Sequence, residues 1–383
     1  MRKEWMINLF LIVNKILFDT CKLFKKSNNI VFISDFGDNA RHVIQALSEK
    51  GYEDIVVLKT AKCKRSFKDV GAREVVSFDI RKLPCYVKGL YRLATARTVV
   101  IDNYVPLLSV CHFNGDTEVI QLWHAAGAVK KFGLADPSLT YRTPQAIKRI
   151  QKVYERMDKV VVGSPHMASV FAKAFGKEQG DFLHTGIPRT DFFFDEKAMH
   201  QAKQRIRDAY PQLQGRKVVL YAPTFRDQEL QKQKIPLDFV KIAEQLGDEY
   251  RLLIKLHPAV VHDLKAMEHP FIISVDKSFP LNELLLVTDF LVSDYSSIPY
   301  EFALLNKPQI FYPYDLAQYS MSRGFWDAYK EVVPGPVVDS DEELVHTIVN
   351  MDFDTAELEA FASLWNVYSD GHASQKLVEY LLK

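Results

Sequence analysis

Short apolar runs alternate with longer amphipathic stretches along most of this chain of 383 residues. A first series of apolar runs lies at 30–33, 55–58, 74–78, 98–101, 119–123 and 159–162. A second series lies at 217–221, 251–256, 271–273, 290–292 and 309–312. Short apolar strands that alternate with helices are typical of parallel sheets with helices on both faces. The pattern therefore predicts an α/β fold with two doubly wound, Rossmann-like sheets.

The chain length also favours two domains, because 383 residues exceed what one ordinary hydrophobic core supports. A polar helical stretch near residues 186–215 separates the two series of strands. Such a stretch suits a connection between domains. We therefore predict an N-terminal segment at 1–28, a first domain at 29–195 and a second domain at 196–383.

The N-terminal segment has a pattern of its own. Lys15 and Asp19 interrupt its apolar residues, so neither a signal peptide nor a membrane-spanning helix is expected. On a helix, the polar residues form one narrow stripe beside a wide apolar face; they are Glu4, Asn8, Lys15, Asp19, Lys22 and Lys26. Together with the excess of lysine, this pattern predicts an amphipathic helix that docks on an anionic membrane surface. The alternative is a first helix packed on the protein's own core.

Composition and missing motifs exclude several classes of protein. Lysine and arginine total 49 against 48 for aspartate and glutamate, so no overall positive field attracts nucleic acid. The four cysteines lie far apart and form neither a zinc nor a disulfide pattern, as expected in a reducing cytoplasm. The chain lacks Walker, GxGxxG, GxSxG and HExxH motifs, which disfavours kinases, dehydrogenases, esterases and zinc proteases.

Candidate chemistry lies in loops that follow strands, where open α/β sheets bind ligands. His124 follows the run at 119–123, and His257 follows the run at 251–256. An unperturbed imidazole has a pKa near 6.5, so it is mostly neutral at cytoplasmic pH and able to accept a proton from a hydroxyl. One such histidine in each domain would suit a cleft that surrounds a phosphoryl group. The alternative for each is a capping or core histidine.

The segment 294–301 is a candidate phosphate site. Ser296 and Ser297 precede Pro299, which is tolerated only in the first turn of a helix, so both serines are expected at a helix N-terminus. Backbone N–H groups and hydroxyls there can bind phosphate, although a simple helix cap is the alternative. Glu301 is expected about two turns into this helix, where its carboxylate could accept both hydroxyls of a ribose. A surface glutamate is the alternative.

Three further residues are candidates for contacts with phosphate. Thr224 and Arg226 lie in the loop after the run at 217–221, and Arg323 lies further along the chain. Arginine binds phosphate oxygens through paired hydrogen bonds, although a solvated turn is the alternative for the first loop. No metal site is predicted, because no acidic cluster with metal-ligand spacing accompanies these residues. Dependence on a divalent metal stays open, with Asp294 as the candidate ligand.

Six short blocks occur in order along the chain. They are QLWHA at 121–125, YAPTFRD at 221–227, KLHP at 255–258, SDYSS at 293–297, FYPYD at 311–315 and RGF at 323–325. Together they resemble the CDP-glycerol glycerophosphotransferase family of wall teichoic acid synthesis, over most of the chain after residue 30. The length and the N-terminal helix are most similar to the primase branch. Ala125 departs from the glycine that many members carry after the histidine, which affects the expected loop geometry but leaves His124 in place.

The resemblance implies two Rossmann-like domains of GT-B type that face each other across a cleft, with the donor in the C-terminal domain. It implies that His124 acts as general base on the acceptor side and that His257 contacts the donor phosphates. Either histidine could take the proton while the other stabilises phosphoryl charge. Glu301 would bind the ribose. The residues expected to bind the donor are Thr224, Arg226, Asp294, Ser296, Ser297, Glu301 and Arg323.

The implied reaction moves one glycerol phosphate from CDP-glycerol to undecaprenyl-diphosphate-linked N-acetylmannosaminyl-N-acetylglucosamine (ManNAc-GlcNAc) and releases CMP. The acceptor's lipid tail stays in the inner leaflet, so a peripheral protein on the cytoplasmic face of the bacterial cell membrane is expected. CDP-glycerol is a substrate, and no cofactor is predicted. Other enzymes of teichoic acid synthesis are candidate partners.

Several alternatives stay open. They are a glycerol-phosphate polymerase, a ribitolphosphotransferase that uses CDP-ribitol, a GT-B glycosyltransferase that uses a nucleotide sugar, and a non-catalytic membrane scaffold. Two domains and one helix leave no further module to retain a growing polymer, which favours transfer of a single unit. Two histidines at strand ends disfavour the scaffold.

Overall fold

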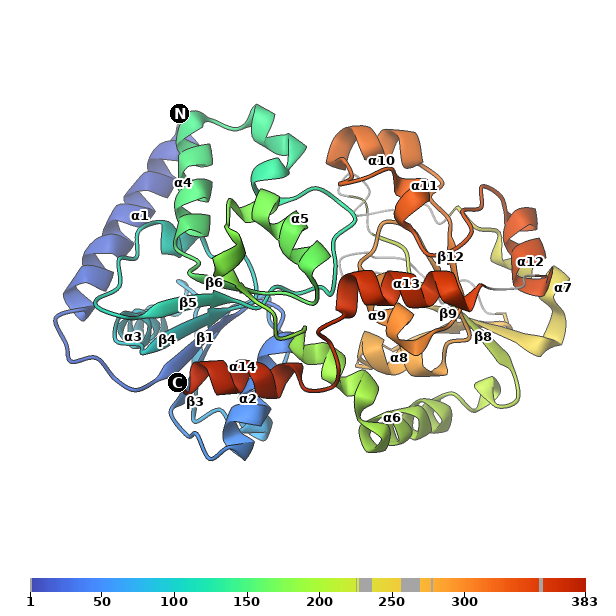
Figure 1. The fold of residues 1–383 in the computed structure, drawn as a ribbon, viewed down its shortest axis with the longest axis horizontal. Helices are drawn as coiled ribbons and strands as arrows, with labels where there is room; N and C mark the ends of the chain where they lie inside the picture. The colour runs from blue at the N-terminus through green and yellow to red at the C-terminus, as the bar shows by residue number, and fades with distance from the viewer. Residues whose placement is uncertain (1, 225, 227–235, 256–268, 277, 351–353) are drawn as a thin grey trace. The chain divides into compact units, whose positions relative to one another are not determined.

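The computed structural model of the protein describes residues 2–224, 226, 236–255, 269–276, 278–350 and 354–383. The chain forms two compact units (Figure 1). The first unit comprises residues 1–125, 132–191 and 367–383, and the second comprises residues 126–131 and 192–366.

The first unit is built on a seven-stranded sheet. Its strands are β1 (Ile30–Ser34), β2 (Ile55–Lys59), β3 (Glu74–Ser77), β4 (Thr98–Ile101), β5 (Glu118–Gln121), β6 (Lys159–Val161) and β7 (Phe182–Leu183). The order is β3-β2-β1-β4-β5-β6-β7, and every neighbouring pair is parallel. β1 and β4 are buried along their whole length, which explains why they read as continuous apolar runs. The parallel sheet is confirmed, whereas β7 was not predicted because two residues carry no periodicity.

The second unit contains a five-stranded parallel sheet. Its strands are β8 (Lys217–Tyr221), β9 (Tyr250–Ile254), β10 (Ile272–Ser274), β11 (Phe290–Ser293) and β12 (Gln309–Phe311). The order β10-β9-β8-β11-β12 repeats that of the first five strands of the first unit. In each sheet the strand order reverses beside the first strand, between β1 and β4 and between β8 and β11. Ligands of open α/β sheets bind at the carboxyl ends of strands beside this reversal.

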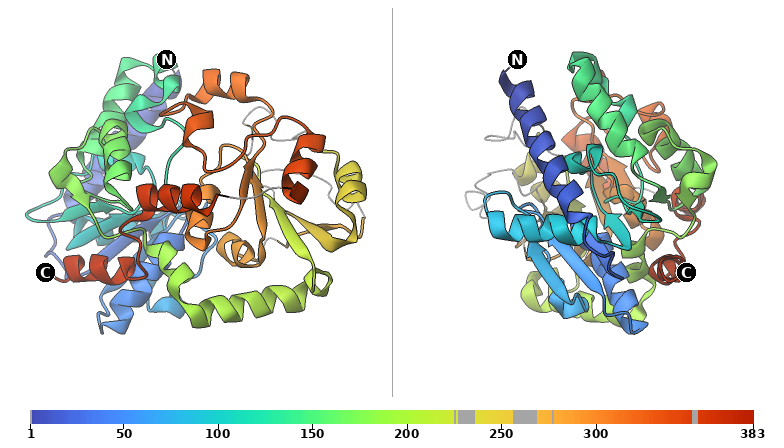
Figure 2. Two further views of the ribbon diagram at one scale, coloured as in Figure 1. Left: turned by 45° about the vertical axis from the view of Figure 1, so that its right-hand side comes forward. Right: turned by 90° about the vertical axis from the view of Figure 1, so that its left-hand side faces the viewer.

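Helices connect the strands within each unit (Figures 1 and 2). Those of the first unit are α1 (Arg2–Cys21), α2 (Asp38–Glu49), α3 (Leu83–Ala94), α4 (Pro144–Glu155), α5 (Pro165–Phe175) and α14 (Ala373–Leu381). Those of the second unit are α6 (Glu196–Ala209), α7 (Phe239–Leu246), α8 (Leu281–Val287), α9 (Ile298–Phe302), α10 (Leu316–Arg323), α11 (Tyr329–Val332), α12 (Asp341–Asn350) and α13 (Thr355–Asn366). Thr143 and Ser164 cap α4 and α5 by accepting hydrogen bonds from backbone N–H groups, and a proline follows each cap.

The division of the chain differs from the predicted domains 1–28, 29–195 and 196–383. The last residues return to the first unit, where α14 packs on α2 and buries Leu377 and Leu381. The Asp191 carboxylate accepts hydrogen bonds from the backbone N–H groups of Ala373 (2.9 Å) and Ser374 (2.8 Å), which caps α14. The apolar side chains of α14 indicate that the helix packs against protein, but sequence alone does not show which unit provides the surface.

The N-terminal helix α1 packs on α3 and turns most of its large apolar side chains outward. Leu11 and Phe18 are buried, while Glu4 forms an ion pair with Arg149 of α4 (2.8 Å), beside which α1 runs (Figure 2). On the outer face, the exposed apolar side chains are Trp5, Met6, Leu9, Phe10, Ile12, Val13 and Ile16. Part of the predicted polar stripe therefore faces the protein. No helix in the described part of the chain is long and apolar enough to cross a membrane.

Candidate active site

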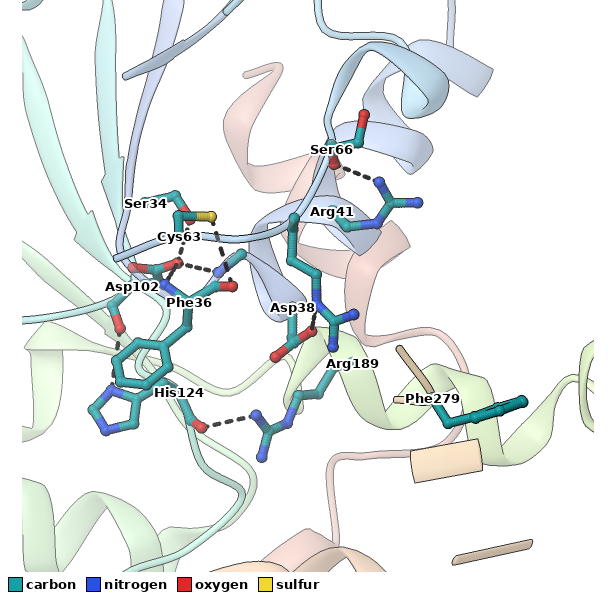
Figure 3. Close-up of polar contacts among 12 residues, drawn as sticks. Ser34, Phe36, Asp38, Arg41, Cys63, Ser66, Asp102, His124, Arg189 and Phe279 are labelled. Atoms are coloured by element: carbon teal, nitrogen blue, oxygen red, sulfur yellow. Dashed lines mark hydrogen bonds and ion pairs between the residues drawn. The ribbon is translucent and has the colours of Figure 1, made fainter. Parts of the chain in front are cut away.

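In the first unit, the Asp102 carboxylate joins the loops that follow β1 and β4. It accepts hydrogen bonds from the Ser34 hydroxyl (2.6 Å) and from the backbone N–H groups of Asp35 (2.8 Å) and Gly37 (2.8 Å) (Figure 3). Burial raises the pKa of Asp102, while these hydrogen bonds favour its charged form. Gly37 has a φ of 92°, a left-handed conformation that suits glycine. Asp102 therefore fixes the backbone at the switch point of this sheet.

His124 lies at the same edge of the sheet, just after β5 (Figure 3). Its ring stacks on Phe36 with centroids 4.2 Å apart, and its Nδ1 lies 3.2 Å from the backbone oxygen of Asp102. A carbonyl oxygen can only accept, so Nδ1 carries the proton and Nε2 is the basic nitrogen of the neutral ring. The half-buried ring is thus held in the tautomer that a general base requires.

The backbone before His124 is strained. Trp123 has a φ of 59°, a conformation that costs a non-glycine residue about 1 to 3 kcal/mol. Its indole stacks on Phe132 (4.7 Å) and packs edge-on against Phe171 (5.6 Å) and Phe175 (5.4 Å). Such strain persists where the surroundings enforce it, which is common at functional sites. The aromatic cluster therefore fixes the direction in which the chain presents His124.

Two further residues hold the carbonyl groups of this turn. Asn39 of α2 donates a hydrogen bond from its side-chain amide to the Trp123 oxygen (2.9 Å). Arg189 donates to the His124 oxygen (2.8 Å) and, from its backbone N–H, to the side-chain oxygen of Asn39 (3.0 Å). These residues and Asp102 were not predicted, because their partners lie far away along the sequence. The only local signal was the position of Asp102 directly after a strand.

The second unit repeats this arrangement at its own switch point. Asp294, which follows β11, accepts a hydrogen bond from the backbone N–H of Thr224 (2.7 Å) in the loop after β8. Asp294 is almost completely buried, as Asp102 is. The two units thus share one arrangement. In the first unit, Asp102 after β4 fixes the loop that follows the neighbouring strand β1. In the second unit, Asp294 after β11 fixes the loop that follows the neighbouring strand β8. Thr224 and Asp294, both predicted as donor-binding residues, lie together.

Arg226 is the centre of a buried ion-pair network. Its Nε and Nη2 donate to the two carboxylate oxygens of Asp315 (2.8 Å each), and its Nη1 donates to the Thr224 oxygen (2.6 Å). Nη1 also lies 3.0 Å from the Asp294 carboxylate. Burial alone would lower the pKa of Arg226, but the hydrogen bonds to Asp315 and the charge of Asp294 raise it above its usual value. The guanidinium is therefore engaged within the protein, and its evident effect is to position Thr224 and Asp294.

The segment after Asp294 forms the expected helix start, with Pro299 in the first turn of α9. Ser296 accepts a hydrogen bond from the Ile298 backbone N–H (3.2 Å), so this serine acts as a cap, whereas Ser297 makes no capping bond with its side chain. Glu301 lies in the first turn and not about two turns in, because α9 begins only at Ile298. It is 2% exposed, so it is not a surface glutamate.

Arg323 and His257 are the two remaining residues that the sequence predicted at the site of the second unit. Arg323 is the last residue of α10, half-buried in the second unit. His257 lies outside the described residues, so its predicted role stays a prediction. Lys130 was not singled out from the sequence, although it lies in the small-residue loop after His124. The structure assigns it to the second unit, where the charges of Asp294, Arg323 and Arg226 act on it.

Comparison with known proteins identifies the family. The profile of the family described as CDP-Glycerol:Poly(glycerophosphate) glycerophosphotransferase matches residues 16–383. The chain belongs to this family. Membership confirms the resemblance carried by the six blocks and the predicted class of enzyme, a glycerophosphotransferase. It disfavours the glycosyltransferase and scaffold alternatives.

Curated relatives within this family cover nearly the whole chain. The teichoic acid glycerol-phosphate primase of Bacillus spizizenii is 36% identical over 383 residues, which span 99% of this chain and 98% of the relative. The primase of Bacillus subtilis is 35% identical, over 93% of this chain and 92% of the relative. The teichoic acid poly(ribitol-phosphate) polymerase of Bacillus spizizenii is 33% identical, but the matched region spans only 56% of that protein.

Among solved structures, a variant of the wall teichoic acid polymerase TagF matches with a TM-score of 0.81 at 22% identity. The match covers 100% of this chain and 97% of that chain. The fold is therefore that of the TagF structures, GT-B-like with parallel sheets, as predicted.

Proposed function

We propose that this protein is a primase that transfers one glycerol phosphate from CDP-glycerol to undecaprenyl-diphosphate-linked ManNAc-GlcNAc and releases CMP. The observation that carries the proposal is sequence identity over nearly the whole chain: the two glycerol-phosphate primases are 36% and 35% identical to it, whereas the poly(ribitol-phosphate) polymerase is 33% identical. A polymerase of glycerol phosphate and a ribitolphosphotransferase are the remaining alternatives within the family.

The chemistry assigned to the first unit is activation of the acceptor. The acceptor hydroxyl attacks the phosphorus that carries glycerol, and its proton passes to Nε2 of His124. The bond between this phosphorus and the bridging oxygen of the diphosphate breaks, so CMP leaves with the electron pair. The hydrogen bond between Nδ1 and the Asp102 oxygen supports this role, because it fixes the required tautomer.

The second unit is assigned to the donor. Thr224, Ser296 and Ser297 lie in the loops at the switch point of the second sheet, which suits contacts with the diphosphate. Arg323 would add positive charge, and His257 would contact the same phosphates. Arg226 and Asp294 would hold these loops in place, as their network suggests.

The outer face of α1 is assigned to the membrane. Exposed apolar side chains continue from α1 to Leu23 and Phe24, and Leu83 at the start of the neighbouring α3 is also exposed. Large exposed apolar patches mark surfaces that interact. Lys25 and Lys26 follow the helix and are exposed, which favours an anionic lipid surface. A peripheral position at the inner leaflet would bring the enzyme to an acceptor that cannot leave the bilayer.

A donor screen tests the proposal. The full chain would be incubated with the lipid-linked disaccharide and, separately, with CDP-glycerol, CDP-ribitol and a UDP-sugar, while released CMP and UDP are measured. We expect acceptor-dependent release of CMP from CDP-glycerol. Faster release from CDP-ribitol would assign the ribitol alternative, and release of UDP would assign a glycosyltransferase. If neither CMP nor UDP is released from any donor, the non-catalytic membrane scaffold would be the remaining alternative.

A further inference from the structure

The loop 126–131 follows β5 of the first sheet but forms part of the second unit. The Val129 oxygen accepts a hydrogen bond from the Trp326 backbone N–H (3.2 Å), and the Lys131 N–H donates to the Gly324 oxygen (3.1 Å). Between these bonds, Lys130 pairs with Phe325 in an antiparallel bridge. The loop is therefore held in a fixed register in the second unit.

Gly127 shows how closely this loop packs against α9. A Cβ atom at Gly127 would lie 2.3 Å from the Tyr300 ring of α9, closer than real side chains approach. The glycine thus allows the loop to lie directly against α9, the helix that follows Ser296 and Ser297. The position of Lys130 is consequently tied to the predicted phosphate loop.

The Lys130 side chain points to the same aromatic cluster as Arg226. Its Nζ lies 5.9 Å from the centre of the Tyr319 ring, and the Arg226 guanidinium lies 4.9 Å from the same ring. Tyr319 stacks on Tyr295 with centroids 3.9 Å apart. Among the described residues, no carboxylate forms an ion pair or a hydrogen bond with Lys130. The ammonium is thus placed by ring contacts and backbone pairing.

A count of charges shows what Lys130 contributes. Arg226 is paired with two carboxylates, Asp294 and Asp315, so this network alone carries one net negative charge. A network with net negative charge repels a diphosphate. Among the described residues, Lys130 adds a positive charge on which Asp294, Arg226 and Arg323 act, and with Lys130 and Arg323 the sum becomes positive. These two residues therefore favour the attraction of an anion to this part of the second unit.

The surroundings of Lys130 also disfavour the charged form of its ammonium group. Burial lowers the pKa of Lys130 to about 8, Asp294 opposes this shift, and Arg323 and Arg226 act in the same direction as burial. Nearby Tyr295 and Tyr319 have pKa values raised by burial, so they stay neutral at this pH. A desolvated ammonium beside two guanidinium groups gains most from an added anion.

We propose that the Lys130 ammonium binds the diphosphate of the donor nucleotide in the second unit. This assignment rests on the proposed function, which supplies a diphosphate to this unit. In this role the loop after β5 contributes His124 to the first unit and Lys130 to the second.

The test measures binding of CDP-glycerol to the full chain by titration calorimetry. Lys130→Met keeps the aliphatic stem on Tyr319 but removes the charge, and we expect about 10- to 100-fold weaker binding, as for one lost charge-assisted contact. Lys130→Arg should stay within a few-fold of the original affinity. Lys131→Met is the matched control, because neighbouring side chains of an extended pair point to opposite sides. It should bind normally.

The pH profile separates charge from packing. The protonated amine binds, so affinity should be complete below about pH 8 and should fall as the pH rises through that value. The diphosphate diester keeps its charge throughout this range. Lys130→Arg should remove the fall up to pH 9.5, because arginine stays protonated. If Lys130 only holds the loop, Lys130→Met would lower the unfolding midpoint while affinity and pH profile stay unchanged, and the proposal would be wrong.

Probing with UDP and CDP as well as CDP-glycerol keeps this proposal distinct from the proposed function. Normal binding of CDP-glycerol by Lys130→Met would overturn the role of Lys130 and leave the function standing. Binding of UDP but not CDP-glycerol, lost in Lys130→Met, would overturn the donor and support the diphosphate site. A wild-type chain that binds none of the three probes would contradict both.

Discussion

Replacing Met6, Ile12 and Ile16 by serine should weaken binding to anionic vesicles by at least about fiftyfold. These side chains lie on the outer face of α1, and they are 52%, 56% and 60% exposed. Transfer of a whole side chain of this kind out of water contributes roughly 1.5 to 3 kcal/mol. The exposed part of each thus contributes about 0.8 to 1.8 kcal/mol, and the three together about 2.5 to 5 kcal/mol. At 1.4 kcal/mol per factor of ten, a weakening of at least about fiftyfold follows.

The assay is co-sedimentation of the full chain with vesicles that contain anionic phospholipid, compared with purely zwitterionic vesicles. Val240→Ser, Val349→Ser and Leu364→Ser form a matched control, because these side chains of the second unit are 52%, 53% and 47% exposed. The control triple should bind vesicles normally. Turnover of a short-chain, water-soluble acceptor should be preserved in both triples.

Equal vesicle binding by the α1 triple and the original chain would refute the assignment of this face to the membrane. Loss of the fold in the α1 triple, with a normal control, would instead show that the outer face packs against protein. A small effect would mean that attraction between the lysines and anionic lipid, and not burial of the apolar side chains, holds the protein at the surface.

Two further predictions concern the sites. His124→Gln should lower turnover by about a hundredfold or more, because a general base acts on the reacting hydroxyl. The affinity for CDP-glycerol, measured by calorimetry, should be preserved, because the base does not act on the donor. Weakened donor binding with normal turnover would contradict this role. Arg226→Met should destabilise the protein by about 3 to 5 kcal/mol in denaturant unfolding, because it leaves the buried Asp294 and the half-buried Asp315 without their cation. Normal stability with weaker CDP-glycerol binding would instead show that Arg226 contacts phosphate directly.

The sequence was sufficient to predict the strands because buried parallel strands are short, apolar and bounded by turns. β1, β4 and β8 all followed this rule. The position of His124 at a strand end followed from the same pattern. The general location of Thr224 and Ser296 could be predicted for this reason too.

What the sequence could not reveal depends on contacts between distant residues. Arg226 lies 89 positions from Asp315, so the pairing of these two residues was not predictable from the sequence. The loop with Lys130 lies between two strands of the first sheet, yet it belongs to the second unit. The helical periodicity of α1 predicted an apolar face and a polar stripe, but not the contacts, such as that of Glu4 with Arg149, that place part of this stripe against the protein.

The most direct test of the central claim is mass spectrometry of the lipid-linked product made with a large excess of CDP-glycerol. Transfer by a primase predicts a single increase in mass, equal to one glycerol phosphate on the disaccharide, however long the reaction runs. A ladder of repeated glycerol-phosphate additions would show a polymerase and contradict the claim.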